Sequence, residues 1–182
     1  PLAVDRIDAC RTGPRFPRPT VVFNHAPVSS KNPDLFARVM TRVLPHHDVA
    51  VLITRDFASW RPGGEAIGAL AARFPEQVLL GRDMPLDEYY EALWAADLQV
   101  STATHESLGV STHDAMYTGN CCVLPRLGSY PEICDGHPDV LTVPLSSLVT
   151  TSPCSSGLGT ACMAPGRRLR AIHRPGRRAT AL

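Results

Sequence analysis

Residues 97–124 read Asp97-Leu-Gln-Val-Ser-Thr-Ala-Thr-His-Glu-Ser-Leu-Gly-Val-Ser-Thr-His-Asp-Ala-Met-Tyr-Thr-Gly-Asn-Cys-Cys-Val-Leu124. The short apolar runs at residues 97–101 and 121–124 predict two buried strands. Between them, residues 109–117 predict a helix, which Gly119 is suited to end. A strand, a helix and a second strand in this order form the βαβ unit of a parallel sheet.

The same alternation continues on both sides of this unit. Further strands are predicted at residues 20–24, 48–54, 77–80 and 140–143. One further helix is predicted to begin at Asn32, a suitable cap, with Pro33 in its first turn, and others are predicted at residues 64–74, 86–96 and 131–134. This alternation predicts the α/β class, with a Rossmann-like, doubly wound parallel sheet of about six strands. Ligands of such sheets bind beyond the carboxyl ends of the strands.

Composition divides the chain into three parts. Residues 1–19 are rich in proline and arginine and lack the apolar core of a signal peptide, so we expect a linker there. Residues 20–145 carry the alternating pattern and are expected to form the folded domain. Residues 146–182 are a low-complexity, basic stretch that we expect to be a disordered tail. The first residue is Pro1 instead of methionine, which indicates a fragment or a processed chain.

Charge, hydropathy and cysteine content indicate which partners and which cellular compartment to expect. All 17 acidic residues precede residue 151, whereas the six basic residues that follow it are arginines. This tail would contact nucleic acid if it is ordered, which is the alternative to a solvated tail. No apolar run reaches the roughly 20 residues that cross a bilayer, so we expect no membrane span. The six cysteines form no CxxC pair, which predicts a reducing compartment, the cytoplasm and in addition the nucleus.

Two carboxylates flank the start of the helix predicted at residues 109–117. Glu106 precedes that helix and Asp114 lies about one and a half turns into it. A helix N-terminus suits a diphosphate, and Gly109 allows close approach of the backbone. At about 1.5 Å per residue, Asp114 lies several Å further along the axis, where it would accept hydrogen bonds from a ribose diol. The alternatives are that Glu106 only stabilises the helix N-terminus and that Asp114 is an ordinary exposed residue.

The pair resembles the Glu-x7-Glu motif of the family-4 retaining glycosyltransferases, which have the GT-B fold. The stretch His105-Glu-Ser-Leu-Gly109 resembles more closely the tRNA-queuosine α-mannosyltransferases. Asn24-His25, Lys31-Asn-Pro33 and the turn Tyr130-Pro-Glu-Ile133 add to this resemblance. It covers about residues 20–143.

The resemblance implies the C-terminal, donor-binding domain of a two-domain enzyme. Such an enzyme would transfer mannose from GDP-mannose to queuosine in tRNA with retention, and would need no metal or other cofactor. The tRNA acceptor would bind an N-terminal domain that this chain lacks. Glu106 would contact the donor sugar and phosphate, Lys31 would neutralise the leaving diphosphate, and Asp114 would bind ribose. The other donor-binding positions would be the backbone of Leu108 and Gly109, and the side chains of His25, His105 and Glu132.

Two departures from the family pattern leave other functions open. Asp114 is one methylene shorter than the usual glutamate, and Ala26 stands where an arginine usually follows the Asn-His pair. Arg55, after the next strand, is a candidate substitute for that arginine. One alternative is a family-4 enzyme with a glycan or lipid acceptor. The other is a truncated, non-catalytic module that only binds nucleotide sugars.

Overall fold

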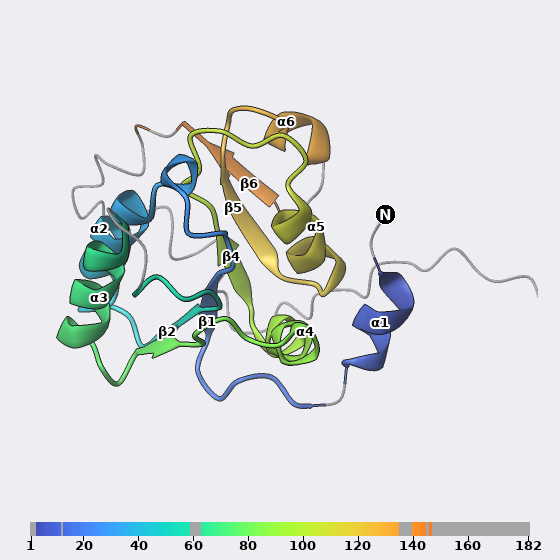
Figure 1. Ribbon diagram of the computed structural model, residues 1–182, viewed down its shortest axis with the longest axis horizontal. Coiled ribbons are helices and arrows are strands. Elements are labelled where there is room, and N and C mark those ends of the chain that lie inside the picture. The colour runs from blue at the N-terminus through green and yellow to red at the C-terminus, as the bar shows by residue number, and fades with distance from the viewer. Residues whose placement is uncertain (1–2, 12, 59–62, 135–139, 145, 147–182) are drawn as a thin grey trace, which may run out of the picture. The chain divides into compact units, whose positions relative to one another are not determined.

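The computed structural model describes residues 3–11, 13–58, 63–134, 140–144 and 146. Within these ranges one sheet contains six strands, all parallel, in the order β3-β2-β1-β4-β5-β6 (Figure 1). The strands are β1 (Thr20–Phe23), β2 (Ala50–Ile53), β3 (Val78–Leu80), β4 (Leu98–Val100), β5 (Cys121–Pro125) and β6 (Val140–Val143). This is the Rossmann strand order, and every predicted strand is present within two residues of its expected ends.

The order of the strands decides where a ligand can enter. The chain fills the sheet outward from β1 to β3 and then returns to place β4 on the other side of β1. The loops that follow β1 and β4 therefore leave the sheet toward opposite faces. In open α/β sheets such a reversal leaves a crevice at the carboxyl ends of the two strands, where ligands bind.

Helices cover both faces of the sheet (Figure 1). In the described ranges they are α1 (Val4–Ala9), α2 (Pro33–Val43), α3 (Gly63–Arg73), α4 (Leu86–Ala95), α5 (Val110–Tyr117), α6 (Tyr130–Ile133) and the 3-10 turn η1 (Ser29–Lys31). Helices α2 and α3 pack on the face that carries Val21 and Phe23 of β1, whereas α1 and α4 pack on the face that carries Val22. This alternation along β1 is the two-residue period of a strand buried on both faces.

The N-terminal cap of α2 is the one that the sequence predicts. The side chain of Asn32 accepts a hydrogen bond from the backbone N–H of Leu35 at 3.4 Å, and Pro33 is the first helical residue. Asn32 itself has a left-handed backbone, with φ of 49°. Asparagine tolerates this conformation better than most residues, so the turn from η1 into α2 is specified locally.

The prediction of a linker over residues 1–19 is wrong for its first half. Residues Val4–Ala9 form α1, and Ile7 of this helix is fully buried against α4. The indole nitrogen of Trp94 donates a hydrogen bond to the Ile7 carbonyl at 2.7 Å, and Arg6 forms an ion pair with Asp87. The folded domain therefore begins before residue 20, because one buried isoleucine and its contacts hold this helix on the core.

Residues Pro1–Thr151 group into one compact unit. The predicted basic tail lies, apart from Ser146, outside the described residues. None of the helices in the described ranges is long and apolar enough to cross a membrane.

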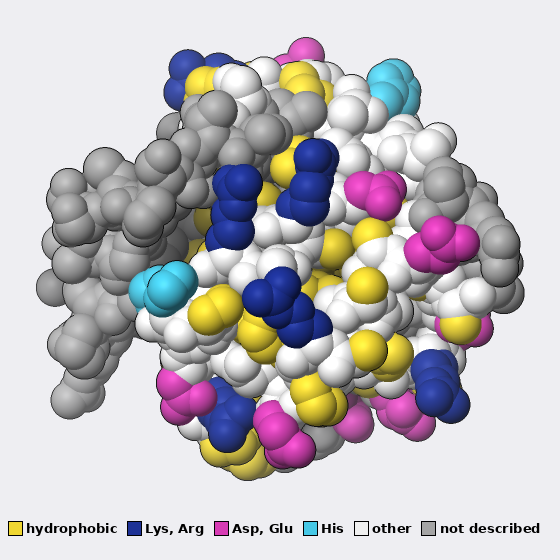
Figure 2. Space-filling model, turned by 90° about the vertical axis from the view of Figure 1, so that its left-hand side faces the viewer, with side chains coloured by type: hydrophobic (Ala, Val, Ile, Leu, Met, Phe, Trp, Pro, Cys, Tyr) yellow, Lys and Arg dark blue, Asp and Glu magenta, His cyan; other side chains and the backbone are white. Residues whose placement is uncertain are grey.

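The outer face of α2 and α3 is basic. Arg38, Arg42 and Arg73 line a shallow groove of about 410 Å³ between the two helices. Figure 2 looks at this side of the molecule, and basic side chains gather near the middle of the view. The groove follows the helices and lies apart from the crevice at the carboxyl ends of β1 and β4, so we assign it no part in the candidate site.

Candidate functional site

Two loops meet at the carboxyl ends of β1 and β4. The Thr102 hydroxyl, after β4, donates to the carbonyls of Lys31 and Asn32, both at 3.0 Å. The backbone N–H of Thr104 donates to the Ser30 carbonyl at 2.7 Å. These bonds bring η1 beside the segment that leads into α5, although the two segments are far apart in sequence.

The meeting of these loops creates an ion pair between the two residues predicted to be catalytic. Lys31 Nζ lies 2.6 Å from Glu106 Oε2, and only 15% and 10% of the two side chains are exposed. Lys31 also donates to the His105 carbonyl at 3.3 Å. Charges so poorly hydrated depend on each other, because removing one partner leaves the other desolvated and unpaired.

Glu106 also satisfies the start of α5. Its second carboxylate oxygen, Oε1, accepts hydrogen bonds from the backbone N–H groups of Ser107 at 3.1 Å and Gly109 at 3.0 Å. Burial alone would raise the pKa of Glu106, but the bonds from Lys31 and Gly109 outweigh it and hold that pKa below its ordinary value. The carboxylate is therefore ionised and occupies donors that any anion at this helix end would use.

Two glycines allow the loop around Glu106 to pack tightly. Gly109 has φ of 67°, and a side chain there would bring its Cβ within 2.7 Å of Ile133 Cδ1. Gly128 has φ of 59°, and its Cβ would lie 2.7 Å from the Glu106 carbonyl oxygen. Both positions have the left-handed backbone that favours glycine. The sequence analysis explains Gly109 by the close approach of a ligand to the backbone. The structure shows that packing against Ile133 also requires a glycine there.

Asp114 is buried inside the site, with 6% of the residue exposed, so the alternative of an ordinary exposed helix residue is wrong. Its Oδ2 accepts a hydrogen bond from the Tyr89 hydroxyl at 3.3 Å. No lysine or arginine of the described ranges forms an ion pair with it. Burial raises the pKa of Asp114, and the bond from Tyr89 offsets only part of this effect. A desolvated carboxylate with one neutral donor retains an unmet demand for donors.

Behind both carboxylates lies a buried polar network. Asn24 donates to the Tyr89 hydroxyl at 3.0 Å and accepts from the Gln99 amide at 3.0 Å. On the other side, the Tyr130 hydroxyl lies 2.7 Å from Ser101 Oγ and donates to Glu106 Oε2 at 3.4 Å. Sequence reasoning did not single out Gln99, Tyr130 or Tyr89 as site residues. The available signal was a glutamine inside a predicted central strand.

His25 follows β1 and faces the same site. The residue is 1% exposed, its Nδ1 lies 3.2 Å from Ser111 Oγ, and its Nε2 has no hydrogen-bond partner among the described residues. Burial, aided by the positive charge of Lys31, lowers the pKa of His25 to about 4. The ring is therefore neutral near pH 7, and its unpaired nitrogen suits the predicted contact with a sugar hydroxyl.

The remaining predicted residues lie at the rim. Leu108, two residues before α5, is 65% exposed. The side chain of His105 is also exposed. Glu132 lies on the exposed side of α6, and no hydrogen bond joins its carboxylate to the described residues. The structure therefore brings Lys31, Glu106 and His25 together, whereas no side-chain hydrogen bond or ion pair joins Glu132 to them.

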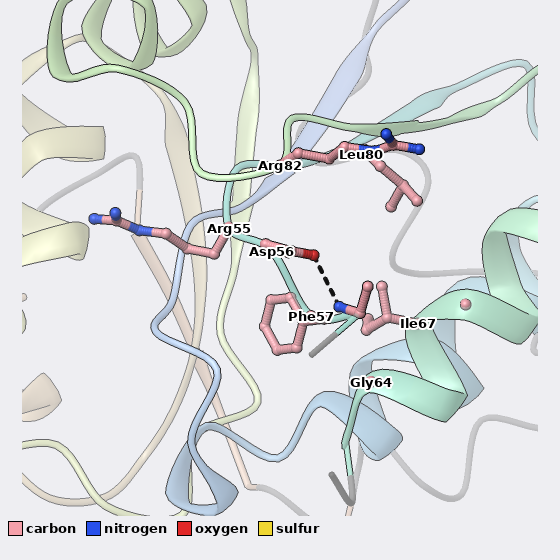
Figure 3. A pocket seen from close by; sticks show the side chains of 9 residues that line it. Arg55, Asp56, Phe57, Gly64, Ile67, Leu80 and Arg82 are labelled. Atoms are coloured by element: carbon pink, nitrogen blue, oxygen red, sulfur yellow. Dashed lines mark hydrogen bonds between the residues drawn. The ribbon is translucent and has the colours of Figure 1, made fainter. Parts of the chain in front are cut away.

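Arg55 follows β2 and borders a separate cavity of about 360 Å³ (Figure 3). Phe57 and Ile67 form the apolar wall of this cavity, and the guanidinium of Arg55 points away from Ile67 (Figure 3). Burial raises the pKa of Tyr89 above its ordinary range, and the positive charge of Arg55 opposes that rise. This effect of Arg55 is the smallest of those named for Tyr89, so the substitution of Arg55 for an arginine at position 26 stays a prediction.

In the part of the chain that the structure describes, no three His, Cys, Asp or Glu side chains gather closely enough to hold a metal ion. The charged partner that the structure supplies to Glu106 is Lys31.

Comparisons with known proteins agree with this geometry at the level of the fold. No family model matches the chain. A glycosyltransferase from Rickettsia africae ESF-5 superposes with a TM-score of 0.61 at 14% identity, over 81% of this chain and 46% of that one. An α,α-trehalose-phosphate synthase (UDP-forming) from Burkholderia xenovorans, in complex with glucose-6-phosphate, gives 0.63 at 15%, over 80% and 38%. Sucrose-phosphate synthase from Thermosynechococcus elongatus gives 0.58 at 17%, over 82% and 37%.

The chain has the fold of the Rossmann-like half of a GT-B glycosyltransferase. It spans less than half the length of each of these three structures. The prediction of the fold class is confirmed. Identities of 14–17% carry the fold alone, so the donor, the acceptor and the roles of single residues are taken up as proposals.

Proposed function

We propose that this chain is the donor-binding half of a retaining glycosyltransferase, and that its site holds a nucleoside diphosphate sugar along α5. The observation that carries the proposal is the presence of two unlike carboxylates, one before α5 and one within it. Glu106 sits at the N-terminus with Lys31, and Asp114 lies further along, buried and short of donors. A ligand with a diphosphate at one end and a diol at the other meets both demands.

The diphosphate would lie where Glu106 now collects its donors. Lys31 and the Gly109 N–H both donate to this carboxylate. An incoming diphosphate would take these donors, and Glu106 would turn to the sugar. As the glycosidic bond breaks, negative charge grows on the diphosphate oxygen, and Lys31 stabilises it in place. Because a lysine supplies this charge, we expect EDTA to leave donor affinity unchanged.

The ribose would lie against Asp114. One carboxylate oxygen already accepts from Tyr89, so the other is available to the two hydroxyl groups of the sugar. Aspartate is one methylene shorter than the glutamate usual at this position. The hydroxyl of Tyr89, on α4, donates a hydrogen bond to the Asp114 carboxylate. This bond would hold the shorter side chain in one position beside the ribose.

The specific reaction that we propose is mannose transfer from GDP-mannose to queuosine in tRNA, with the tRNA held by a further domain. It is supported by the sequence resemblance around His105–Gly109 and Tyr130–Ile133. A UDP-sugar donor and a sugar or sugar-phosphate acceptor are the second candidate, because two neighbours are named as trehalose-phosphate and sucrose-phosphate synthases. A module that binds but does not transfer is the third, favoured by Ala26.

Calorimetric titration with GDP, GDP-mannose, UDP and UDP-glucose tests the proposal. We expect saturable binding of one nucleotide pair, weakened at least tenfold in Glu106→Ala and in Asp114→Ala. Arg73→Ala, on the distant α2–α3 groove, is the control and should bind as the parent chain does. Absence of binding to all four ligands would overturn the proposed function. Transfer to tRNA, in the presence of a supplied acceptor domain, then separates the candidates.

A further inference from the structure

The hydrogen bonds around Asn24 have a fixed direction. Asn24 Nδ2 lies 2.8 Å from the carbonyl of Ser111, which can only accept. The amide nitrogen must therefore face this carbonyl, and the amide oxygen must face Gln99. Gln99 consequently donates to Asn24 Oδ1 at 3.0 Å and, with its second hydrogen, to Thr112 Oγ1 at 3.3 Å.

The orientation of the Asn24 amide also decides which hydrogen bond the Tyr89 hydroxyl donates. The second amide hydrogen of Asn24 goes to the Tyr89 hydroxyl at 3.0 Å, so the tyrosine oxygen is an acceptor in that bond. A phenol has one proton, and the other neighbour of the hydroxyl is Asp114 Oδ2 at 3.3 Å. Tyr89 therefore donates to Asp114. The side chains of Asn24 and Gln99 are buried, so water does not compete for these bonds.

We infer that Tyr89 is a positioning residue that holds Asp114 for a ribose diol and makes the site prefer ribonucleotides. By filling Oδ2, Tyr89 fixes the rotation of the carboxylate and leaves Oδ1 as the acceptor that faces the ligand. A nucleotide without the 2′ and 3′ hydroxyl groups would give this oxygen no donor, and sites built around a hydrogen bond penalise such a loss strongly. The inference rests on the proposed function, because it assigns a ligand to Asp114.

Tyr90 provides a matched control on the same helix. Both tyrosines are 6% exposed, and their rings pack against each other at 5.2 Å. The hydroxyl of Tyr90, unlike that of Tyr89, makes no hydrogen bond to a described residue. A loss of packing or helix stability would affect both phenylalanine variants, whereas loss of the Asp114 contact would affect Tyr89→Phe alone.

The test measures affinity of the full chain for GDP and UDP, each beside its 2′,3′-dideoxy counterpart, by calorimetry. We expect Tyr89→Phe to weaken binding of the ribonucleotide roughly three- to tenfold and to leave the dideoxy nucleotide unchanged. Tyr90→Phe should keep the ratio of the two affinities. An unchanged ratio in Tyr89→Phe, with Asp114→Ala still losing ribonucleotide affinity, overturns the inference and spares the proposed function. No effect of Asp114→Ala overturns the proposed function itself.

Asn24→Asp tests the same inference without altering the tyrosine, should Tyr89→Phe fail to fold. This change replaces the amide donor by an acceptor of equal size. The proton of Tyr89 would then be drawn to residue 24, and Asp114 would lose its donor. We expect the ratio of ribonucleotide to dideoxynucleotide affinity to fall as it does in Tyr89→Phe. A ratio equal to that of the parent chain would contradict the direction assigned to the network.

Discussion

The two carboxylates of the motif, Glu106 before α5 and Asp114 within it, have opposite character. Glu106, before the helix, is paired with Lys31 and two backbone N–H groups, and its pKa lies below the ordinary value. Asp114, on the helix, is buried beside a neutral tyrosine, and its pKa lies above the ordinary value. Two acids eight positions apart in one motif therefore meet different physical conditions.

This difference suits the two carboxylates to different parts of a ligand. The Glu106 end is electrostatic: a cation and a helix terminus are ready for an anionic group. The Asp114 end is built from neutral hydrogen bonds, and the carboxylate there lacks donors that a diol would supply. Substitutions of Glu106 partners and of Asp114 should consequently change the free energy of unfolding by different amounts and in opposite directions.

Lys31→Met should produce the largest effect on stability. It leaves Glu106 desolvated without its cation, which we expect to lower the free energy of unfolding by about 3 kcal/mol. Urea denaturation measures the change. In the double variant Lys31→Met/Glu106→Gln both charges are gone, and the loss should be clearly smaller. Equal losses with and without Glu106 would show that the pair is not coupled.

Lowering the pH should destabilise the protein through His25. Its pKa is about 4 in the folded chain and 6.5 ordinarily. Between these values the unfolded chain binds a proton that the folded chain does not, so the free energy of unfolding decreases as the pH falls from 6.5 to 4. The full contribution is about 3 kcal/mol. In His25→Gln this slope should disappear from a series of urea titrations, and its persistence would place the titrating group elsewhere.

Alanine substitutions of Gly109 and Gly119, which flank α5, measure how much each left-handed glycine contributes to stability. Gly109→Ala combines a left-handed backbone with a clash on Ile133, so we expect a loss of about 2 kcal/mol. Gly119→Ala has φ of 81° but nothing within 4 Å of the new Cβ, so we expect about 1 kcal/mol. Thermal unfolding of the two variants measures the difference. Equal losses would mean that contact with Ile133 adds nothing.

Asp114→Asn should change stability by a small amount and in the opposite direction. The variant removes a buried charge that has no cation, so we expect the free energy of unfolding to rise by about 1 kcal/mol at pH 7. The folded-state pKa of Asp114 is raised, so the cost of its charge appears only as the pH rises above 3.8. The gain should therefore vanish near that pH. A loss of stability at pH 7 would show that the charge is already compensated.

Local pattern was enough to predict most elements of the fold. The strand at residues 140–143 and the helix that starts after Asn32 appear where the sequence places them, because apolar period and capping act within a few residues. The helix at Val4–Ala9 was missed. Its stability comes from Ile7 against α4, a contact across more than 80 residues that no local pattern reveals.

The candidate site was predicted in part for the same reason. Glu106, Lys31 and Asp114 could be named from their spacing and from family resemblance. The network behind them could not, because Gln99, Tyr89 and Tyr130 come from three different elements. Their meeting depends on the register of the strands and on how α4 packs, which a linear sequence does not display.

The most direct test of the account is a two-dimensional NMR titration of the isotope-labelled chain with pyrophosphate, with guanosine and uridine, and with GDP and UDP. We predict that pyrophosphate shifts the amide signals of Ser107 and Gly109, that one of the nucleosides shifts signals around Asp114 and Tyr89, and that its diphosphate shifts both sets. Pyrophosphate and nucleoside shifting the same residues, or a bound diphosphate shifting neither set, would contradict a single ligand laid along α5.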